Sequence, residues 1–429
     1  MTNRFTWLQI RDRAAFVRLT SVLFLVYLAT GLWSPLLAVY TRSLGAETAQ
    51  IGLVLATFQI ANLASQYWWG RFSDRIGRRK PLLLLGTAGM ALAYIGVASA
   101  GQYGWLFAAR ALEGVALSAY STGSLALIGD LLEEQTGRGR LMGAYRTFGS
   151  LAFAIAALSG GWLADSFSLR VPFAIAALCY LLAFALGTSI VEQPTAVSTS
   201  LADQAPRSKD ETSAPLSNGL SSLVLGQRRR ALWSFLALLS VWMFAMSAVV
   251  PLWPVFMANI GYSKTAIGGL WALAALGEVS CMILAGQMSD RWGRKRVMLT
   301  GFVSMSGVYL AYTLSPSLSW IVGVQLVRSF AYASMEAPAL LYATELGLRR
   351  QRGRLAGLFY SAGSLGAIAG SIVGGVIAQW VGLPSMFRMV VALMLAVALV
   401  IGKVMPRLRS AQPDLADLPL GAHGARHEV

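Results

Sequence analysis

Five ionisable side chains interrupt long apolar stretches of this 429-residue sequence, and their types suit chemistry inside a membrane. They are Arg110, Glu113, Glu278, Arg328 and Glu336. A charged side chain at the centre of a bilayer costs about 2.5–3.5 kcal/mol on insertion scales, so each is a candidate functional residue. A glutamate in a medium of low dielectric constant can bind and release a proton, and a neighbouring arginine can hold it in an ion pair.

Glu278 lies near the middle of the apolar stretch 266–288, where the bilayer is least polar. The chain contains an internal repeat, described below, and the position equivalent to Glu278 in the first copy is Asn62. This asymmetry indicates a specialised task such as carrying a proton. The alternative is a protonated or hydrogen-bonded glutamate that only packs against its neighbours.

The other four candidates fall on two helical faces. Arg110 and Glu113 are spaced i, i+3, so they share a face of one helix. Their ion pair either opens when substrate or a proton binds, or is a permanent structural pair. Arg328, Tyr332 and Glu336 follow one another with the spacing i, i+4, i+8, which places them in one stripe that can line a cavity.

The composition indicates a membrane protein. The chain is 56% hydrophobic and only 13% charged, whereas an average soluble protein has roughly 25% charged residues. Its mean hydropathy is +0.59. A membrane-spanning helix needs about 20 apolar residues, and this pattern predicts an all-α membrane protein with twelve spans: 15–41, 50–70, 81–100, 104–130, 141–164, 169–190, 231–258, 266–288, 297–315, 319–346, 354–380 and 385–404.

Two similar loops lie half a chain apart. The stretch Gly70–Lys80 reappears as Gly286–Arg296, and each copy separates two apolar runs. Pro35 and Pro251 also match at this offset. Six spans separate the copies, so the repeats are parallel about an axis normal to the membrane. We expect Gly70 and Gly77 to let the chain leave a helix and turn sharply.

The repeat divides the chain into four parts. We predict an N-terminal six-helix bundle over 1–190 and a C-terminal six-helix bundle over 231–404. The segment 191–230 is rich in Ser, Thr, Ala, Pro and Asp, so it cannot bury a core and is predicted to be a cytoplasmic linker. The segment 405–429 is predicted to be a cytoplasmic tail.

The distribution of positive charge predicts the orientation. The chain has 35 lysines and arginines and a net charge of +16, yet the predicted outer loops hold four basic residues: Arg42, Arg170, Lys264 and Arg388. Most of the others lie in the inner loops and tails, which places both termini in the cytoplasm. The basic residues are scattered over short loops that face anionic lipid, so they do not form a nucleic-acid-binding surface.

The duplicated loop resembles a motif of the major facilitator superfamily. The pattern Gly-x-x-x-Asp-Arg-x-Gly-Arg between spans 2 and 3, repeated between spans 8 and 9, is highly specific to that family, and the resemblance covers nearly the whole chain. Arg110 and Gly114 match a second motif, Arg-x-x-x-Gly in span 4, which is associated with proton coupling. The Gly-Pro pair that marks many drug-proton antiporters is absent from span 5, where 156–161 reads Ala-Ala-Leu-Ser-Gly-Gly.

The resemblance implies a gate at the cytoplasmic side. In the family, the aspartate of the first loop docks on the N-terminus of span 11, where unpaired N–H groups favour a carboxylate. Asp74 takes that role here, and repeat symmetry places Asp290 at the start of span 5. The alternative is a plain topogenic loop. The candidate gating residues are Gly70, Asp74, Arg75, Gly77, Arg78, Gly286, Asp290, Arg291, Gly293 and Arg294.

These features predict a secondary active transporter of the twelve-span drug and sugar efflux branch, in the cytoplasmic (inner) membrane. It would export a lipophilic or sugar-like small molecule against protons by alternating access, as a monomer. Proton-coupled uptake of a small solute is the alternative, and a non-transporting sensor is a third hypothesis. The only histidines, His423 and His427, lie in the tail, and Cys179 and Cys281 have no metal-binding spacing. We therefore expect no enzyme, metal site or cofactor.

Overall fold

The computed structural model describes residues 13–76, 78–132, 138–192, 218–346 and 352–405. These residues form twelve long helices and two short ones, and this described part contains no strand. Helices suit this sequence because a chain surrounded by lipid must satisfy every backbone hydrogen bond within its own segment. The expected all-α class is confirmed.

The first half of the chain contains seven helices: α1 (Arg13–Trp33), α2 (Leu37–Ser43), α3 (Thr48–Ile76), α4 (Lys80–Ala98), α5 (Gly104–Leu132), α6 (Arg138–Ser166) and α7 (Val171–Thr188). The second half contains another seven: α9 (Asn218–Val249), α10 (Trp253–Asn259), α11 (Lys264–Trp292), α12 (Arg294–Ala311), α13 (Leu318–Leu346), α14 (Arg352–Val381) and α15 (Leu383–Val404). The helix α9 begins at Asn218, inside the segment expected to be linker.

Nine segments of the described chain meet the length and hydropathy of a membrane span. The helices α3, α12 and α13 do not meet that criterion, so the count of twelve spans stays a prediction. The division of the chain into two bundles, a cytoplasmic linker and a cytoplasmic tail stays a prediction as well.

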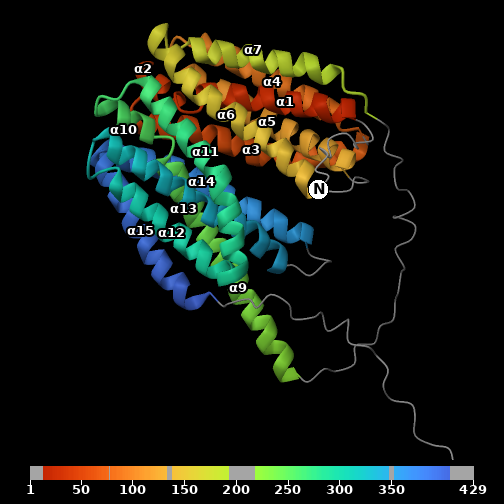
Figure 1. The fold of residues 1–429 in the computed structure, drawn as a ribbon, viewed down its shortest axis with the longest axis vertical. Helices are drawn as coiled ribbons and strands as arrows, with labels where there is room; N and C mark the ends of the chain where they lie inside the picture. The colour runs from red at the N-terminus through yellow and green to blue at the C-terminus, as the bar shows by residue number, and fades with distance from the viewer. Residues whose placement is uncertain (1–12, 77, 133–137, 193–217, 347–351, 406–429) are drawn as a thin grey trace, which may run out of the picture.

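The two halves repeat one arrangement. In the first half, α1 packs against α6 and α7, and in the second half α9 packs against α14 and α15. Similarly, α5 packs against α3 and α4, and α13 packs against α11 and α12. Figure 1 shows the first half as red to yellow helices above the second half in green to blue. The parallel repeat predicted from the duplicated loops is therefore present in the fold.

The first span of each half is broken at its matching proline. The turn between α1 and α2 contains Pro35, and the turn between α9 and α10 contains Pro251. Proline lacks a backbone N–H and clashes with the preceding turn, so it ends a helix. The chain closes the two turns in the same way: Leu36 donates to the carbonyl of Trp33 at 2.9 Å, and Leu252 to that of Val249 at 3.1 Å.

The halves meet through α6 against α11 and through α3 against α14. We call the face that carries the duplicated loops the motif face, and the face that carries the turns at Gly45 and Gly261 the turn face. Both glycines have positive φ angles, of 90° and 97°, which favour glycine. Figure 1 shows α2 and α10 close together at the turn face, and the two halves diverge away from it.

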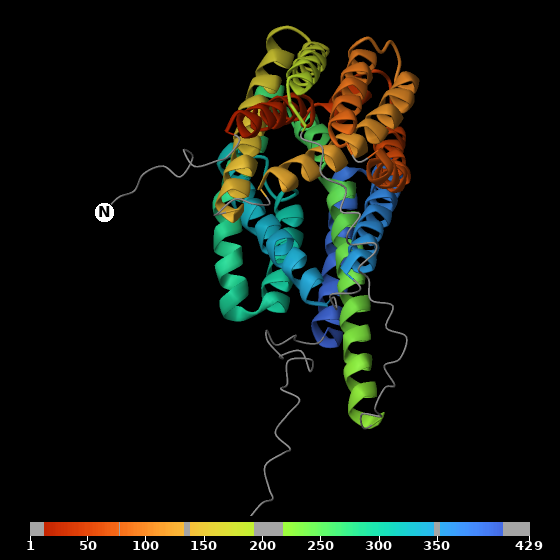
Figure 2. The ribbon, with the colours of Figure 1, turned by 90° about the vertical axis from the view of Figure 1, so that its right-hand side faces the viewer.

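Small residues let the halves approach closely near the turn face. A Cβ atom on Gly268 would lie 2.1 Å from the carbonyl oxygen of Ala157. A Cβ atom on Gly52 would lie 2.3 Å from the carbonyl oxygen of Ser371, at the repeat-related crossing. Side chains would prevent this contact, so glycine is required at both crossings. Figure 2 shows the two halves from the side.

The loop lysines anchor each motif loop within its own half. Lys80 donates to the carbonyl of Thr188 at the end of α7, at 2.6 Å. Lys295 donates to the carbonyls of Gly402, at 2.8 Å, and Met405 at the end of α15. The final carbonyls of a helix lack partners inside the helix, and a lysine ammonium satisfies them. Glu192 adds a cap at the start of α4, where it accepts from the backbone N–H of Lys80 at 3.1 Å.

The orientation in the membrane stays a prediction and can be measured directly. A fluorescent protein fused after Val429 is expected to fluoresce in bacterial cells, because positive loop charge places the C-terminus in the cytoplasm. Alkaline phosphatase, which is active only in the periplasm, is expected to be inactive at the same position. An active phosphatase would imply an odd number of spans and contradict the twelve-span topology.

Candidate functional site

The glycines that open the duplicated loops lie inside helices. Gly70 is part of α3, which continues to Ile76, and Gly286 is part of α11, which continues to Trp292. The expectation that Gly70 lets the chain leave a helix was wrong, because the residues up to Ile76 continue α3 and no proline interrupts them. The turn in the second copy occurs at Gly293, whose φ is 85°. Gly77, its equivalent, lies outside the described residues.

The charged residues of the loops make contacts within their own half. Asp290, near the end of α11, pairs with Arg294, the first residue of α12, at 3.0 Å, and the Asp290 side chain is 72% exposed. Arg79 pairs with Asp130 at the end of α5, at 2.8 Å. Arg75, Arg78 and Arg291 are exposed. The side chains of Asp74 and of the first residues of α6 and α14 lie outside the described part of the structure, so both proposed docking contacts stay predictions.

The role of Asp74 can be tested by a change that keeps the shape of the side chain. Asp74→Asn removes the negative charge that would bind the start of α14, so we expect normal insertion and transport reduced by at least about tenfold. Labelling of cysteines placed at the motif face should become faster. Wild-type transport with unchanged labelling would contradict a gating role, and Asp203→Asn, in the predicted linker, provides a matched control.

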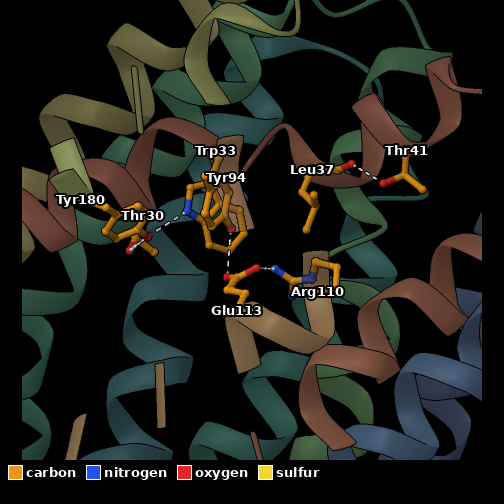
Figure 3. Close-up of polar contacts among 8 residues, drawn as sticks. All are labelled: Thr30, Trp33, Leu37, Thr41, Tyr94, Arg110, Glu113 and Tyr180. Carbon is orange, nitrogen blue, oxygen red and sulfur yellow. Dashed lines mark hydrogen bonds and ion pairs between the residues drawn. The ribbon is translucent and has the colours of Figure 1, made fainter. Parts of the chain in front are cut away.

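The first half contains a closed ion pair. Arg110 and Glu113, both on α5, form a salt bridge, and their side chains are only 4% and 3% exposed. Tyr94 on α4 donates its hydroxyl to the second oxygen of Glu113 at 2.9 Å. The Arg110 guanidinium also lies over the rings of Phe58, at 4.4 Å, and Trp33, at 5.4 Å. Of this group, Figure 3 shows Arg110, Glu113, Tyr94 and Trp33.

Aromatic residues hold this pair in place from the neighbouring helices. Trp33 on α1 lies 5.0 Å from Tyr94, ring centre to ring centre, and donates its indole N–H to the hydroxyl of Tyr180 on α7. Thr30 shares a hydrogen bond with the same hydroxyl at 3.2 Å (Figure 3). No sequence pattern singles out Tyr94 or Tyr180, because a tyrosine in an apolar span is ordinarily a packing residue. The surroundings favour the permanent-pair interpretation of Arg110 and Glu113.

The second half contains a looser pair. Glu278 on α11 lies 3.5 Å from Arg328 on α13, and the two side chains are 22% and 11% exposed. The Arg328 guanidinium also lies over the ring of Trp271, at 5.9 Å. This pair joins two helices that are far apart in the sequence, so residue spacing could not reveal it. Both residues were predicted as candidates, but as members of separate features.

The rest of the α13 stripe lies beside this pair. Tyr332 and Glu336 are both partly buried, one and two turns beyond Arg328. Glu336 forms no ion pair with any described residue, in contrast to Glu113 and Glu278. Trp242 on α9 is completely buried, and its indole N–H has no hydrogen-bond partner among the described residues. In the stripe, Arg328 is therefore ion-paired, and Glu336 has no basic partner among the described residues. Tyr332 lies between them in the sequence.

Trp271 connects the Glu278–Arg328 pair to the interface between the halves. The Arg328 guanidinium lies over its ring at 5.9 Å, and the ring also stacks on Phe153 of α6 at 6.4 Å between ring centres. Ala157 and Ala272 lie in the same small apolar cluster between α6 and α11. Glu278 is therefore linked through Arg328 and Trp271 to the interface between the halves.

Two hydrogen-bonded helix caps close the turn face. Asp165 at the end of α6 accepts hydrogen bonds from the backbone N–H and the hydroxyl of Thr265, each at 2.7 Å, and pairs with Lys264 at 3.0 Å. Gln379 at the end of α14 accepts from the backbone N–H of Ala49 at 3.1 Å. Each cap joins the end of a helix in one half to the start of a helix in the other half.

These caps occupy repeat-related positions. Asp165 and Gln379 have the same offset as the glycine pairs of spans 5 and 11, and Ala49 and Thr265 have the same offset as the duplicated loops. Gln379 also donates to the carboxylate of Glu47. The caps and the two glycine crossings all bring the halves together near the turn face. The structure therefore represents a state that is closed at the turn face.

A groove of about 640 Å³ runs along α1 in the half of the molecule nearer the motif face. Its lining is mostly apolar, with three aromatic rings and two hydroxyl groups: Arg13, Phe16, Val17, Thr20, Ser21, Phe24, Leu25 and Phe148. Its volume falls in the range of small-molecule sites. The groove lies on the side of the molecule where the halves diverge.

Comparisons with known proteins agree with this architecture. The family model described as "MFS_1 like family" matches residues 16–389. The maltose permease of Geobacillus stearothermophilus is 30% identical over 356 residues, which cover 82% of this chain and 85% of the permease. Multidrug resistance protein 2 of Bacillus subtilis (strain 168) is 24% identical, over 85% of this chain and 89% of that protein.

A solved structure supports the fold. The crystal structure of the nucleoside transporter NupG superimposes with a TM-score of 0.74, covering 91% of this chain and 98% of that one, at 16% sequence identity. The family match covers far more than half of the chain, and it agrees with the duplicated loop and the repeated helical halves. The chain therefore belongs to the major facilitator superfamily, within the MFS_1 like family, and is a multi-pass membrane protein that acts as a secondary transporter.

Proposed function

We propose that this protein exports a lipophilic or sugar-like small molecule in exchange for protons, by alternating access across the cytoplasmic membrane. Glu278 carries the proton, the two halves rock against each other, and the monomer is the working unit. Both termini lie in the cytoplasm, so the motif face is cytoplasmic and the turn face is external. The described state is then closed to the outside.

The observation that carries this proposal is the position of Glu278 beside the moving interface. In the ionised state the Glu278 carboxylate attracts Arg328 and holds it over the ring of Trp271. Trp271 in turn stacks on Phe153, so the position of Arg328 influences that stacking contact. Protonation removes that attraction and leaves Arg328 to find another partner, which a buried charge needs. The protonation state of Glu278 thus biases the packing of α6 against α11.

The transport cycle also requires the closed turn face to open. Opening this face breaks the caps at Asp165 and Gln379 and separates the glycine crossings. Closing the motif face forms the contact proposed for Asp74. The two sets of contacts cannot form together if each half moves as a rigid body, so the central site faces one side at a time.

The leading hypothesis, export, and its alternative, uptake, differ in the direction of substrate transport. The relatives include a permease and a multidrug resistance protein, so their names support either direction. Vesicles with an acidic interior and inverted orientation should accumulate substrate if the protein exchanges it for protons. Right-side-out vesicles in acidic buffer should accumulate substrate if the protein takes both up together. A protein that moves no solute in either preparation would favour the sensor hypothesis.

A further inference from the structure

A second groove, of about 550 Å³, lies near the motif-face end of α3 and shares no lining residue with the groove along α1. Its lining combines four aromatic rings with two guanidinium groups: Ser65, Tyr67, Trp68, Trp69, Arg71, Phe72, Arg75 and Val115. All of these residues belong to α3 except Val115, which belongs to α5. None of the described lining residues is acidic, and the volume falls in the range of small-molecule sites.

This second groove faces away from the interface between the halves. The helix α3 meets the other half through α14, and Gly52 lies at that crossing. At about 100° per residue, Trp68 lies about 160° from Gly52 around the axis of α3. Tyr67 and Trp68 are 63% and 71% exposed. In a multi-pass membrane protein, an exposed surface that points away from the other half contacts lipid.

The two arginines of the groove can bind an anion from outside the chain. Arg71 and Arg75 are both exposed, and neither forms a salt bridge with a described side chain. Arg71 donates to the hydroxyl of Tyr67 at 2.6 Å, and its guanidinium lies over the same ring at 5.5 Å. The Tyr67 ring thus holds the guanidinium in place, while its described contacts use one of five N–H donors. The arginines are spaced i, i+4, so they share a face of α3, and guanidinium groups bind phosphate with two parallel hydrogen bonds.

The aromatic rings form an apolar surface beside these charges. Trp69 donates its indole N–H to the carbonyl of Val115 on α5 at 3.0 Å, which joins the two walls of the groove. Its ring meets Phe72 edge to face at 5.7 Å, and the rings of Tyr67 and Trp68 meet at 6.2 Å. Tryptophan and tyrosine are typical of the headgroup level of a membrane, where an apolar ring meets acyl chains and its polar group meets the headgroups.

The second half shows that the fold does not require these residues. The segment 67–71, Tyr-Trp-Trp-Gly-Arg, corresponds to 283–287, Ile-Leu-Ala-Gly-Gln, at the offset of the duplicated loops. Ile283 and Leu284 are 64% and 52% exposed, so the equivalent surface of α11 is exposed as well, but it is aliphatic and uncharged. Aliphatic residues suffice for contact with acyl chains alone. The aromatic and cationic set of the first half therefore indicates a ligand that also carries an anionic group.

We propose that this groove binds an anionic phospholipid from the membrane leaflet at the motif face. The phosphate lies between Arg71 and Arg75, and the upper part of an acyl chain lies along the rings of Trp68 and Phe72. Basic pockets between transmembrane helices on the cytoplasmic side suit anionic headgroups, and the motif face is the predicted cytoplasmic face. The inference goes beyond the proposed function, because it depends neither on the direction of transport nor on proton coupling.

Lipid binding by the purified full chain tests the proposal. The protein in detergent is titrated with phosphatidylglycerol, or with phosphatidylcholine that has the same acyl chains, and bound lipid is counted by native mass spectrometry. We expect one phosphatidylglycerol per chain to bind at least about tenfold more tightly than phosphatidylcholine. The double variant R71Q/R75Q should remove this preference and leave phosphatidylcholine binding unchanged. Equal affinity for the two lipids in the wild type, or an unchanged preference in the double variant, would overturn the proposal.

The second half provides a matched control for charge. Arg291 is the repeat equivalent of Arg75 and is also exposed, but it follows the aliphatic segment 283–287. R291Q removes the same charge from the same face of the molecule and should leave the preference for phosphatidylglycerol unchanged, whereas R75Q should weaken it severalfold. If the two variants weaken it equally, binding reflects the general charge of the motif face, and the discrete site is overturned.

Tryptophan fluorescence tests the position of the lipid. W68L introduces the residue that the second half has at this position, Leu284, and should weaken phosphatidylglycerol binding severalfold. The part of the fluorescence that W68L removes should be quenched by phosphatidylglycerol with brominated acyl chains at lower concentration than by brominated phosphatidylcholine. Equal quenching by the two lipids would place the bound phosphatidylglycerol elsewhere and overturn the site. Thermal unfolding confirms that each variant is folded before its lipid binding is measured.

Discussion

Glu278→Gln is expected to abolish pH-driven accumulation of substrate while exchange across the membrane continues. Glutamine keeps the shape of the side chain but can neither carry a proton nor attract Arg328. Counterflow needs no net proton movement, so it should persist in the variant. Accumulation needs the free energy of the proton gradient to enter the cycle, so the ratio of internal to external substrate should fall to about one.

The measurement compares counterflow and gradient-driven uptake in the same vesicle preparation. Glu278→Asp, which keeps an ionisable group, serves as the matched variant and should retain some coupling. If Glu278→Gln still concentrates substrate under an imposed pH gradient, Glu278 is not the essential proton carrier. Glu336 and Glu113 would then be tested next, and the enclosed position of Glu113 makes Glu336 the first of the two.

Local features of the fold were predictable from the sequence because they depend on neighbouring residues. The breaks at Pro35 and Pro251 follow from the missing N–H of proline, and the Arg110–Glu113 pair follows from their spacing on one helix. The position of Gly70 was misjudged, because a glycine inside a helix resembles one that ends a helix. Whether the helix ends or continues at such a glycine depends on the residues after it. Here those residues continue α3 to Ile76 and α11 to Trp292.

The parts of the candidate site that join distant helices were not predictable. The contact between Glu278 and Arg328 depends on how α11 packs against α13, and the cap of Asp165 on Thr265 depends on how the halves meet. Neither the spacing of these residues nor their types encode a partner. The repeat contains a partial signal for the caps, because Asp165 and Gln379 are related by the same offset as the Gly160-Gly161 and Gly374-Gly375 pairs.

The ion pairs of the two halves have different surroundings, although the halves share one fold. The ion pair of the first half lies within one helix, is enclosed by aromatic rings and receives a further hydrogen bond from Tyr94. The ion pair of the second half joins two helices, is more exposed and adjoins the interface through Trp271. A pair that must change during transport needs the second arrangement, because proton access and movement both require incomplete burial.

Gly268→Ala is expected to shift the protein away from the state closed at the turn face. The added methyl group would lie 2.1 Å from the carbonyl oxygen of Ala157, a backbone atom that cannot rotate away. The adjacent Gly269→Ala is a close control, because its methyl group would meet only the Leu158 side chain, at an ordinary 3.5 Å. Overpacking of this kind costs about 1–3 kcal/mol, which shifts a two-state equilibrium by about 5- to 150-fold.

Cysteine labelling on both sides of the membrane measures that shift. In Gly268→Ala, a cysteine in place of Ala157 or Ala272 should react faster from the turn face, and labelling at the motif face should slow down. Net transport should fall by at least about tenfold, because a transporter that rarely closes one face cannot complete its cycle. Gly269→Ala should resemble the wild type in every measurement. Identical labelling in the two variants would show that the α6–α11 crossing can widen without opening the turn face, and the closure would then depend on the caps at Asp165 and Gln379 and on the crossing at Gly52.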